Sequence, residues 1–262
     1  MTTAAVDFLA FAEELFAAER DRKQIPAFSG RAALSAEDAY AIQLANVTKR
    51  QAAGEKVAGK KIGLTALAMQ KMLGVDQPDF GHLFANMRIE DGAECKIDEL
   101  IQPRVECEIG IILSRSLRGP GLTDLDVLGA TEALVPTLEI VDSRIENWKI
   151  KFVDTVADNG SSARFVVGTK KTKPAGIDTR TVGVVFSKNG DLMGTGAGAA
   201  VLGANPFRAV AWLANTLAGA GLELNAGDVI MPGALCAMVP VVRGDVASAD
   251  FGILGTVSVR FV

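Results

Sequence analysis

The chain has 262 residues, of which 49% are hydrophobic and 22% are charged, and its formal net charge is −4. This balance is typical of a folded globular protein with one large domain or two modest ones. No block of Lys and Arg stands out, so we expect no nucleic-acid partner, and no apolar run approaches the roughly 18–20 residues that a membrane helix needs.

Three cysteines, Cys95, Cys107 and Cys236, and a single histidine, His82, limit the available chemistry. An odd number of cysteines without a Cys-x-x-Cys pair predicts neither a disulfide framework nor a zinc site. The acidic, amphipathic N-terminus differs from a presequence, so the cytoplasm is the expected location. Any catalysis is expected to depend mainly on carboxylates, lysine, tyrosine, water and metal.

Two helices are predicted at the start of the chain. Apolar residues recur at helical spacing over 4–20, and a second helix is expected to run from Ser35, an N-cap with Asp38 three residues later, to about Val47. The interpretation is a helical N-terminal segment over residues 1–56.

From Val57 onward, short β-rich runs alternate with turn signals, and a helix from Phe207 to about Gly219 interrupts them. Few strands alternate with helices in the βαβ manner. The sequence therefore predicts an α+β fold in which residues 57–262 form a β-rich catalytic domain with antiparallel or mixed sheets.

Two neighbouring lysines, Lys60 and Lys61, occur in the first of these β-rich runs. A basic turn on the surface is the ordinary explanation. The alternation of Val57, Gly59 and Lys61 instead indicates that one lysine of the pair faces inward, where it needs a carboxylate partner or a lowered pKa. Either condition makes that lysine a candidate acid/base or oxyanion ligand.

Two polar turns follow the lysines at intervals. Asp79 lies in a turn-forming run at 77–81, where capping the turn is the commoner role, and His82 is expected to be satisfied or exposed rather than a ligand. The cluster at 158–162 is either an ordinary loop or a substrate-binding loop with hydroxyl and amide donors.

Glu106 and Glu108 are the most informative residues of the chain. Alternate residues around them, Val105, Cys107 and Ile109, are apolar, which is typical of a β-strand. A strand directs both glutamates to one face, with Cβ atoms about 6–7 Å apart. Like charges at this separation repel each other unless a cation lies between them.

A third carboxylate, Glu139, also occurs inside an apolar run. The solvated face of an edge strand would explain an isolated Glu-x-Glu pair, but the strand at 105–113 is too apolar for a wet edge. Three carboxylates embedded in hydrophobic strands suit Mg²⁺ or Mn²⁺, which prefer oxygen ligands. The sequence therefore predicts a divalent metal site.

The glycine-rich run at 194–198 does not indicate a dinucleotide-binding fold. Its spacing is not Gly-x-Gly-x-x-Gly, its glycines do not open the following helix directly, and no acidic residue is placed to bind a ribose. We therefore reject a Rossmann fold.

Motifs along nearly the whole chain point to one family. They lie at 59–65, 72–81, 100–108, 139–144, 148–151, 154–159, 196–200, 210–217 and 255–261. Together they resemble the 2-keto-4-pentenoate hydratases of the fumarylacetoacetate hydrolase superfamily. The resemblance implies a helical N-terminal segment packed on a mixed β-roll, with Mg²⁺ or Mn²⁺ held by Glu106, Glu108 and Glu139.

The same resemblance implies further site residues. The lysine of the family's Gly-x-Lys-x-Gly-Leu-Thr motif falls on Lys61, the aspartate of its Gln-Pro-Asp-Phe-Gly motif on Asp79, and the serine of its Ala-Asp-Asn-x-Ser stretch on Ser161. The first two would be catalytic and the serine would bind substrate. The chain departs from the family at Gly160, where alanine is usual, and at 231–235, where a hydroxyl contact to substrate is not implied.

The implied activity is hydration of a 2-hydroxy-2,4-dienoate, formed by meta-cleavage of aromatic rings, to a 4-hydroxy-2-oxo acid. The sister enzyme 4-oxalocrotonate decarboxylase, which shares the fold and the metal ligands, is the alternative. A substrate with an extra carboxylate would want a basic partner, for which Arg144, Lys149 and Arg164 are candidates.

The resemblance also bears on partners. It implies a homo-oligomer, and a complex with the sister enzyme is an open alternative. A non-catalytic scaffold that only stabilises a partner is disfavoured, because nothing structural requires three buried carboxylates.

Overall fold

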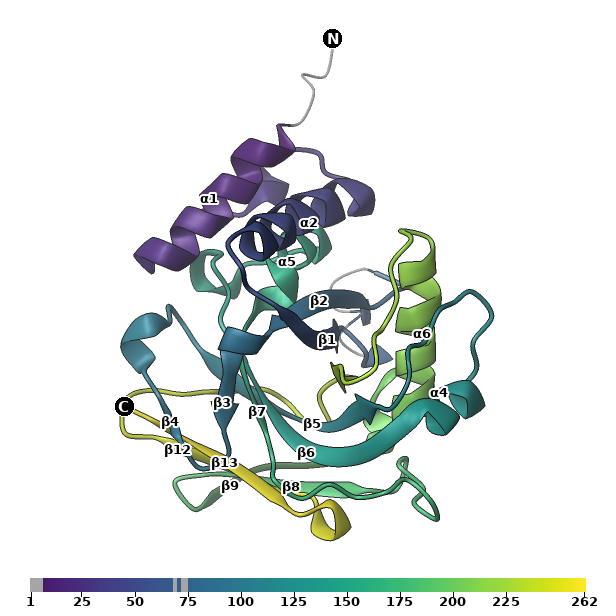
Figure 1. The fold of residues 1–262 in the computed structure, drawn as a ribbon. Helices are drawn as coiled ribbons and strands as arrows, with labels where there is room; N and C mark the ends of the chain where they lie inside the picture. Colours follow the sequence, from purple (N-terminus) through teal and green to yellow (C-terminus); the bar gives the residue numbers. More distant parts are fainter. Residues whose placement is uncertain (1–6, 68–69, 72–74) are drawn as a thin grey trace.

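The structure of the chain is a computed structural model that describes residues 7–67, 70–71 and 75–262. Two β-sheets form its body (Figure 1). The larger has the strand order β2-β1-β10-β5-β6-β7-β3, with β11 also paired to β5, and the smaller has the order β4-β13-β12-β8-β9.

The strands of the larger sheet come from both halves of the chain. They are β1 (Val57–Gly63), β2 (Asp79–Phe84), β3 (Arg88–Glu90), β5 (Arg104–Leu113), β6 (Thr131–Val141), β7 (Ser162–Val167), β10 (Val229–Met231) and β11 (Val239–Pro240). Those of the smaller sheet are β4 (Glu94–Cys95), β8 (Gly183–Lys188), β9 (Asp191–Ala197), β12 (Val246–Asp250) and β13 (Thr256–Phe261).

Both sheets are mixed. β1 pairs with β10, β3 with β7, and β4 with β13 in parallel, whereas β5 pairs with β6 and β8 with β9 in antiparallel fashion. The prediction of a mixed β fold is thereby confirmed. The long β5–β6 ladder lies at the centre of the larger sheet, and residues of both strands that face the smaller sheet belong to the main hydrophobic core.

Helices α1 (Phe8–Asp21) and α2 (Ala36–Ala52) lie side by side at one end of the molecule, next to α5 (Phe152–Ala157) (Figure 1). Ser35 caps α2 as expected: its hydroxyl accepts the Asp38 N–H, and the Asp38 carboxylate accepts the Ser35 N–H. This reciprocal pair satisfies two donors of the first turn. The expected first helix begins at Phe8, and residues 4–6 lie outside the described part of the chain.

On the other side of the larger sheet, α4 (Asp124–Ala130) packs against α6 (Pro206–Ala218) (Figure 1). The expected helix near Phe207 is therefore confirmed. Asn205 caps it by accepting the Phe207 N–H, and Pro206 occupies the first turn, where its missing N–H costs nothing.

The N-terminal helices share a hydrophobic core with α5. Leu15 of α1, Ile42 of α2 and Val156 of α5 belong to the same buried cluster. The division of the chain into residues 1–56 and 57–262 stays a prediction. Among the described residues, no helix combines the length and the apolar character needed to cross a membrane.

Candidate active site

Three glutamates from two adjacent strands meet on one face of the larger sheet. Glu106 of β5 lies directly opposite Glu139 of β6, and Glu108 follows two residues along β5. One carboxylate oxygen from each lies within 4.8 Å of the others. Glu108 and Glu139 are fully buried and Glu106 is half-buried. The strand alternation that places Glu106 and Glu108 on one face thus combines with the β5–β6 register to add Glu139.

Several of these buried oxygens lack a hydrogen-bond partner. Within the described residues, no hydrogen-bond partner is found for Glu108 Oε1 or Glu139 Oε1, and Glu139 Oε2 has only the Lys61 ammonium 3.5 Å away as an ion-pair partner. A buried carboxylate without a partner is costly, and a hard divalent cation with oxygen ligands removes that cost. The donor set therefore fits Mg²⁺ or Mn²⁺.

The carboxyl groups are electrostatically coupled. Burial, opposed by Lys61 and reinforced by Glu139, raises the pKa of Glu106 to about 7. Burial and the two neighbouring glutamates raise the pKa of Glu108 well above its usual range, and burial raises that of Glu139 despite Lys61. A bound cation would reverse these shifts by favouring the ionised carboxylates.

Lys61 of β1 faces the glutamates. Its Nζ lies 3.5 Å from Glu139 Oε2, and its side chain is 5% exposed. Burial alone would lower the pKa of Lys61, but the nearby charges, led by Glu139 and Asp79, outweigh it and raise the pKa above the usual lysine value. The side chain is therefore an ammonium ion at neutral pH.

Lys61 faces inward, as expected for one lysine of the pair, and Lys60 is buried as well. In the sheet register Lys60 lies opposite His82 of β2, and the His82 ring contacts the side chain of Gln43 of α2 at 3.1 Å. Burial, reinforced by Lys60, lowers the pKa of His82 to about 3. His82 is thus a neutral, satisfied core histidine, one of the two outcomes expected for it.

Asp79 is the first residue of β2 and lies opposite Gly63 of β1. The Thr155 hydroxyl donates to Asp79 Oδ2 at 3.2 Å, whereas buried Oδ1 has no hydrogen-bond partner among the described residues. Burial raises the pKa of Asp79, and Lys61 opposes the rise. A Cβ atom at Gly63 would lie 2.1 Å from Asp79 Oδ1 and 3.2 Å from Lys61 Nζ. Glycine at position 63 therefore makes room for both groups.

The segment at 231–235 contributes a backbone donor. The Gly233 N–H donates to Glu108 Oε2 at 2.6 Å. Gly233 has a φ of +123°, and a Cβ atom there would lie 2.1 Å from Thr65 Oγ1. Both the positive φ and the lack of space for a Cβ atom require glycine at this position. Its N–H orients the Glu108 carboxylate.

A turn of three residues with left-handed backbone lies beside the Lys61 side chain. Asn159, Gly160 and Ser161 have φ values of 56°, 60° and 55°. The Asn159 side chain clamps the turn to β2, because Oδ1 accepts the His82 N–H at 2.7 Å and Nδ2 donates to the His82 carbonyl at 2.9 Å. A Cβ atom at Gly160 would lie 3.0 Å from Lys61 Cδ. Left-handed backbone is costly for residues other than glycine, so these contacts must hold the turn in place.

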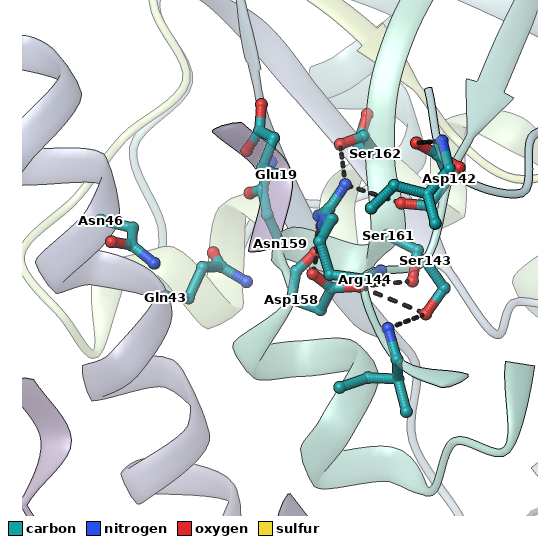
Figure 2. A network of polar contacts seen from close by, with 12 residues as sticks. Glu19, Gln43, Asn46, Asp142, Ser143, Arg144, Asp158, Asn159, Ser161 and Ser162 are labelled. Atoms are coloured by element: carbon teal, nitrogen blue, oxygen red, sulfur yellow. Dashed lines mark hydrogen bonds and ion pairs between the residues drawn. The ribbon is translucent and has the colours of Figure 1, made fainter. Parts of the chain in front are cut away.

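A buried arginine, Arg144, contacts the residues at both ends of this turn (Figure 2). The Arg144 guanidinium forms an ion pair with Asp158 and donates to the carbonyls of Asp142 and Ser162 at 2.8 and 3.2 Å. The Ser161 hydroxyl donates to Asp158 Oδ2 at 3.2 Å. The Arg144 guanidinium is thus paired with the Asp158 carboxylate, and the Ser161 hydroxyl donates to the same carboxylate.

The structure brings five of the six residues singled out by the sequence into one group; they are Lys61, Asp79, Glu106, Glu108 and Glu139. Ser161 lies in the adjoining turn with its hydroxyl on Asp158. Sequence reasoning did not single out Thr155, whose contact to Asp79 joins distant segments and leaves no local pattern. Asn159 was included only as an amide donor of the cluster at 158–162, and its contacts to the His82 backbone were not anticipated.

Comparisons with known proteins agree with this picture, although no family model matches the chain. It is 47% identical over 252 residues to the 2-hydroxyhexa-2,4-dienoate hydratase of Comamonas testosteroni, with 95% of each protein covered. It is 51% identical over 212 residues to a 2-hydroxypent-2,4-dienoate hydratase of Pseudomonas putida, covering 80% of this chain and 95% of the relative.

Among solved structures, the 4-oxalocrotonate decarboxylase of Pseudomonas putida G7, complexed with magnesium and adipate, superposes with a TM-score of 0.95. The identity is 39%, with 100% of this chain and 99% of that chain covered. The fumarylpyruvate hydrolase of Pseudomonas aeruginosa, in complex with Mn²⁺ and pyruvate, covers 78% of this chain and 88% of its own. It has a TM-score of 0.63 at 14% identity and shows a likeness of fold alone.

The mixed sheets therefore define the fumarylacetoacetate hydrolase fold, and the relatives named as hydratases show that the protein is an enzyme. Within that class, the chain belongs to the 2-keto-4-pentenoate hydratase family.

Proposed function

We propose that the protein is a hydro-lyase that adds water to a 2-hydroxy-2,4-dienoate and yields a 4-hydroxy-2-oxo acid. The observation that carries this proposal is the convergence of three kinds of group: the Lys61 ammonium, Asp79 with one unpartnered oxygen, and three glutamates, of which two are fully buried and Glu106 is half-buried. Identities of 47% and 51% to proteins named as dienoate hydratases support the substrate class.

The three glutamates are the proposed ligands of Mg²⁺ or Mn²⁺. Their unpartnered oxygens support the assignment, as do the magnesium in the related decarboxylase and the Mn²⁺ in the fumarylpyruvate hydrolase. When bound, the cation supplies Lewis-acid stabilisation of negative charge on the 2-oxygen of the substrate.

The net reaction requires protons at two carbons and a hydroxyl at a third. A proton added at C5, with loss of the enol proton, converts the dienol to a 2-oxo-3-enoate. Water then adds its oxygen at C4 and loses one proton, and C3 gains one proton, which gives the product. Lys61 is the proposed proton donor, because its raised pKa keeps it charged in the buried site.

Asp79 is the proposed acceptor for the attacking water. The Thr155 hydroxyl occupies Oδ2, which leaves Oδ1 to accept a hydrogen bond from water. Ser161 is the proposed substrate-binding residue, and its hydroxyl would exchange Asp158 for the substrate on binding.

The second candidate is decarboxylation of 4-oxalocrotonate, favoured by the TM-score of 0.95 to a decarboxylase. That substrate carries a second carboxylate and calls for a cation. Arg144 is committed to Asp158, Arg164 to Glu99 at 3.0 Å, and Lys149 is exposed. The residues considered for that partner are thus not free in the site, and the hydratase is the better assignment.

Incubation with each substrate separates the two functions. We expect 4-hydroxy-2-oxopentanoate from 2-hydroxypenta-2,4-dienoate and little CO₂ from 4-oxalocrotonate. Rapid CO₂ release from 4-oxalocrotonate without hydration of the dienoate would show that the protein is a decarboxylase instead.

We also propose that the protein works in the cytoplasm as a homo-oligomer. Val185, Met193 and Ile253 are large apolar side chains that are 52%, 41% and 60% exposed. Val185 and Ile253 line the same surface pocket, and contiguous exposed apolar surface is typical of subunit contacts. A complex with a sister decarboxylase is a separate proposal, which co-purification of the two proteins would test.

A further inference from the structure

Two cysteines that are 129 residues apart in sequence have their sulfur atoms 3.3 Å apart. Cys107 lies in the middle of β5 between Glu106 and Glu108 and is buried, whereas Cys236 lies between β10 and β11 and is half-buried. Neither takes part in the proposed hydration. The two thiols are in direct contact without being bonded.

Backbone contacts on both sides hold the thiols together. The Leu235 N–H donates to the Cys107 carbonyl at 3.0 Å, which fixes the Cys236 segment beside β5. On the β9 side, a Cβ atom at Gly196 would lie 1.9 Å from the Leu235 carbonyl oxygen, and one at Gly194 would lie 3.3 Å from Cys236 Sγ. The segment is therefore packed closely between β5 and β9, and the contact does not depend on a mobile side chain alone.

The remaining gap is small. Sulfur atoms in a disulfide are about 2.05 Å apart, so the two thiols must approach by roughly 1.3 Å, within the reach of a change in side-chain torsion. We propose that Cys107 and Cys236 are a modification site, at which a hydroperoxide converts the two thiols into an intramolecular disulfide.

The chemistry begins at Cys236, the more exposed sulfur. Its sulfur attacks one oxygen of hydrogen peroxide, the O–O bond breaks, and the second oxygen leaves as water after taking a proton, so that a sulfenic acid forms. The Cys107 sulfur then attacks the Cys236 sulfur, the S–O bond breaks, and the hydroxyl leaves with the Cys107 proton as water. The two thiols lose two electrons and two protons, and the peroxide is reduced to two waters.

The link would have a structural consequence at the metal ligands. Cys107 lies between two of them on β5, and Cys236 is three residues from Gly233, whose N–H donates to Glu108. The disulfide would thus tie the strand that carries Glu106 and Glu108 to the segment that orients Glu108. Cys95 of β4 is buried in the other sheet and provides an internal control.

The test uses the full-length, metal-loaded protein. It is treated with hydrogen peroxide, its remaining thiols are alkylated after denaturation, and its peptides are mapped by mass spectrometry. We expect loss of two of the three thiols, a Cys107–Cys236 peptide lighter by two hydrogens, and recovery of both thiols with dithiothreitol. Retention of all three thiols, or links that pair Cys95 or two chains, would overturn the proposal.

Variants separate the two steps. Cys107→Ala should accumulate a sulfenic acid at Cys236 that dimedone traps, Cys236→Ser should keep the Cys107 thiol, and Cys95→Ala should form the link as the parent does. If Cys107→Ala fails to fold, the half-buried Cys236→Ser and the mapping of the parent protein still decide the question. Rapid oxidation of Cys107 in Cys236→Ser would contradict the proposed order.

Discussion

The Lys61 ammonium lies 3.5 Å from Glu139 Oε2, so that the proposed proton donor and a proposed metal ligand form one buried ion pair. Truncation of either partner would leave a buried charge uncompensated, which is far more costly than loss of an exposed pair. The ammonium also lies beside the Asn159–Ser161 turn. We therefore expect metal binding and proton transfer at the proposed site to depend on the position of this turn.

Glu108→Gln should abolish metal-dependent hydration without unfolding the protein. The amide keeps the shape of the side chain but removes an anionic ligand from a buried site, and we expect a loss in kcat on the order of 10²-fold or more. Circular dichroism and Mn²⁺ titration would accompany the assay. Glu90→Gln, at a glutamate whose side chain is 77% exposed, is the control. Unchanged turnover in Glu108→Gln would exclude this ligand assignment.

Lys61→Met should lower kcat by about 10²- to 10⁴-fold if the ammonium is a proton donor. Lys60→Met is the matched variant, because Lys60 is the adjacent buried lysine and lies opposite His82 rather than beside Glu139. We expect a much smaller change in kcat for that variant. A loss below about ten-fold in Lys61→Met would reduce the role of Lys61 to a structural ion pair.

Affinity for Mn²⁺ should rise with pH through the neutral range. Burial raises the pKa of Glu106 to about 7, so this carboxyl is largely protonated below that pH, and a metal ion must displace its proton. Each displaced proton makes the affinity fall by about ten-fold per pH unit below the pKa. Calorimetric titration of metal-stripped protein between about pH 6 and pH 8 measures this slope. An affinity that is independent of pH would contradict the shift.

Asn159→Ala should lower both stability and kcat. The variant loses two hydrogen bonds to the His82 backbone and keeps a Cβ atom at a φ of 56°, which together cost about 2–3 kcal/mol of unfolding free energy. Because the turn contacts Lys61, kcat should fall more than KM changes. Urea denaturation and steady-state kinetics measure the two effects.

A matched control for Asn159→Ala exists at Asn189. Its φ is 57°, and its side chain also makes two hydrogen bonds, to Asp245 and to the Val246 N–H, in the turn between β8 and β9 of the smaller sheet. Asn189→Ala should destabilise the protein by a similar amount and leave kcat unchanged. Equal effects of both variants on kcat would remove the positioning role of Asn159.

The sequence could predict the acidic cluster of Glu106, Glu108 and Glu139 because strand alternation is a local property. Glu106 and Glu108 share a face in any regular strand, and their apolar surroundings indicated burial. The pairing of Glu106 with Glu139 depends on the β5–β6 register, which the spacing of the residues alone could not specify. The apolar surroundings of all three glutamates already suggested one shared site, and the resemblance to the hydratases implied the same three ligands.

Other features depended on long-range packing. The alternation over residues 57–61 could indicate one inward-facing lysine but not the burial of Lys60. Lys60 is buried too, and α2 lies close to that face of the sheet, where Gln43 contacts His82. Arg144 was a candidate partner for a substrate carboxylate, but Asp158, 14 residues away, pairs with it instead. The close approach of Cys107 and Cys236 likewise follows from the fold and has no signature in the sequence.

The most direct test of the proposed function is proton NMR of 2-hydroxypenta-2,4-dienoate with metal-stripped enzyme, before and after addition of Mg²⁺ or Mn²⁺. We predict that 4-hydroxy-2-oxopentanoate forms only after the metal is added, and that with metal Glu108→Gln forms it about 10²-fold more slowly or not at all. Hydration at the full rate without metal would contradict the account, and so would simple ketonisation at the uncatalysed rate in the presence of metal.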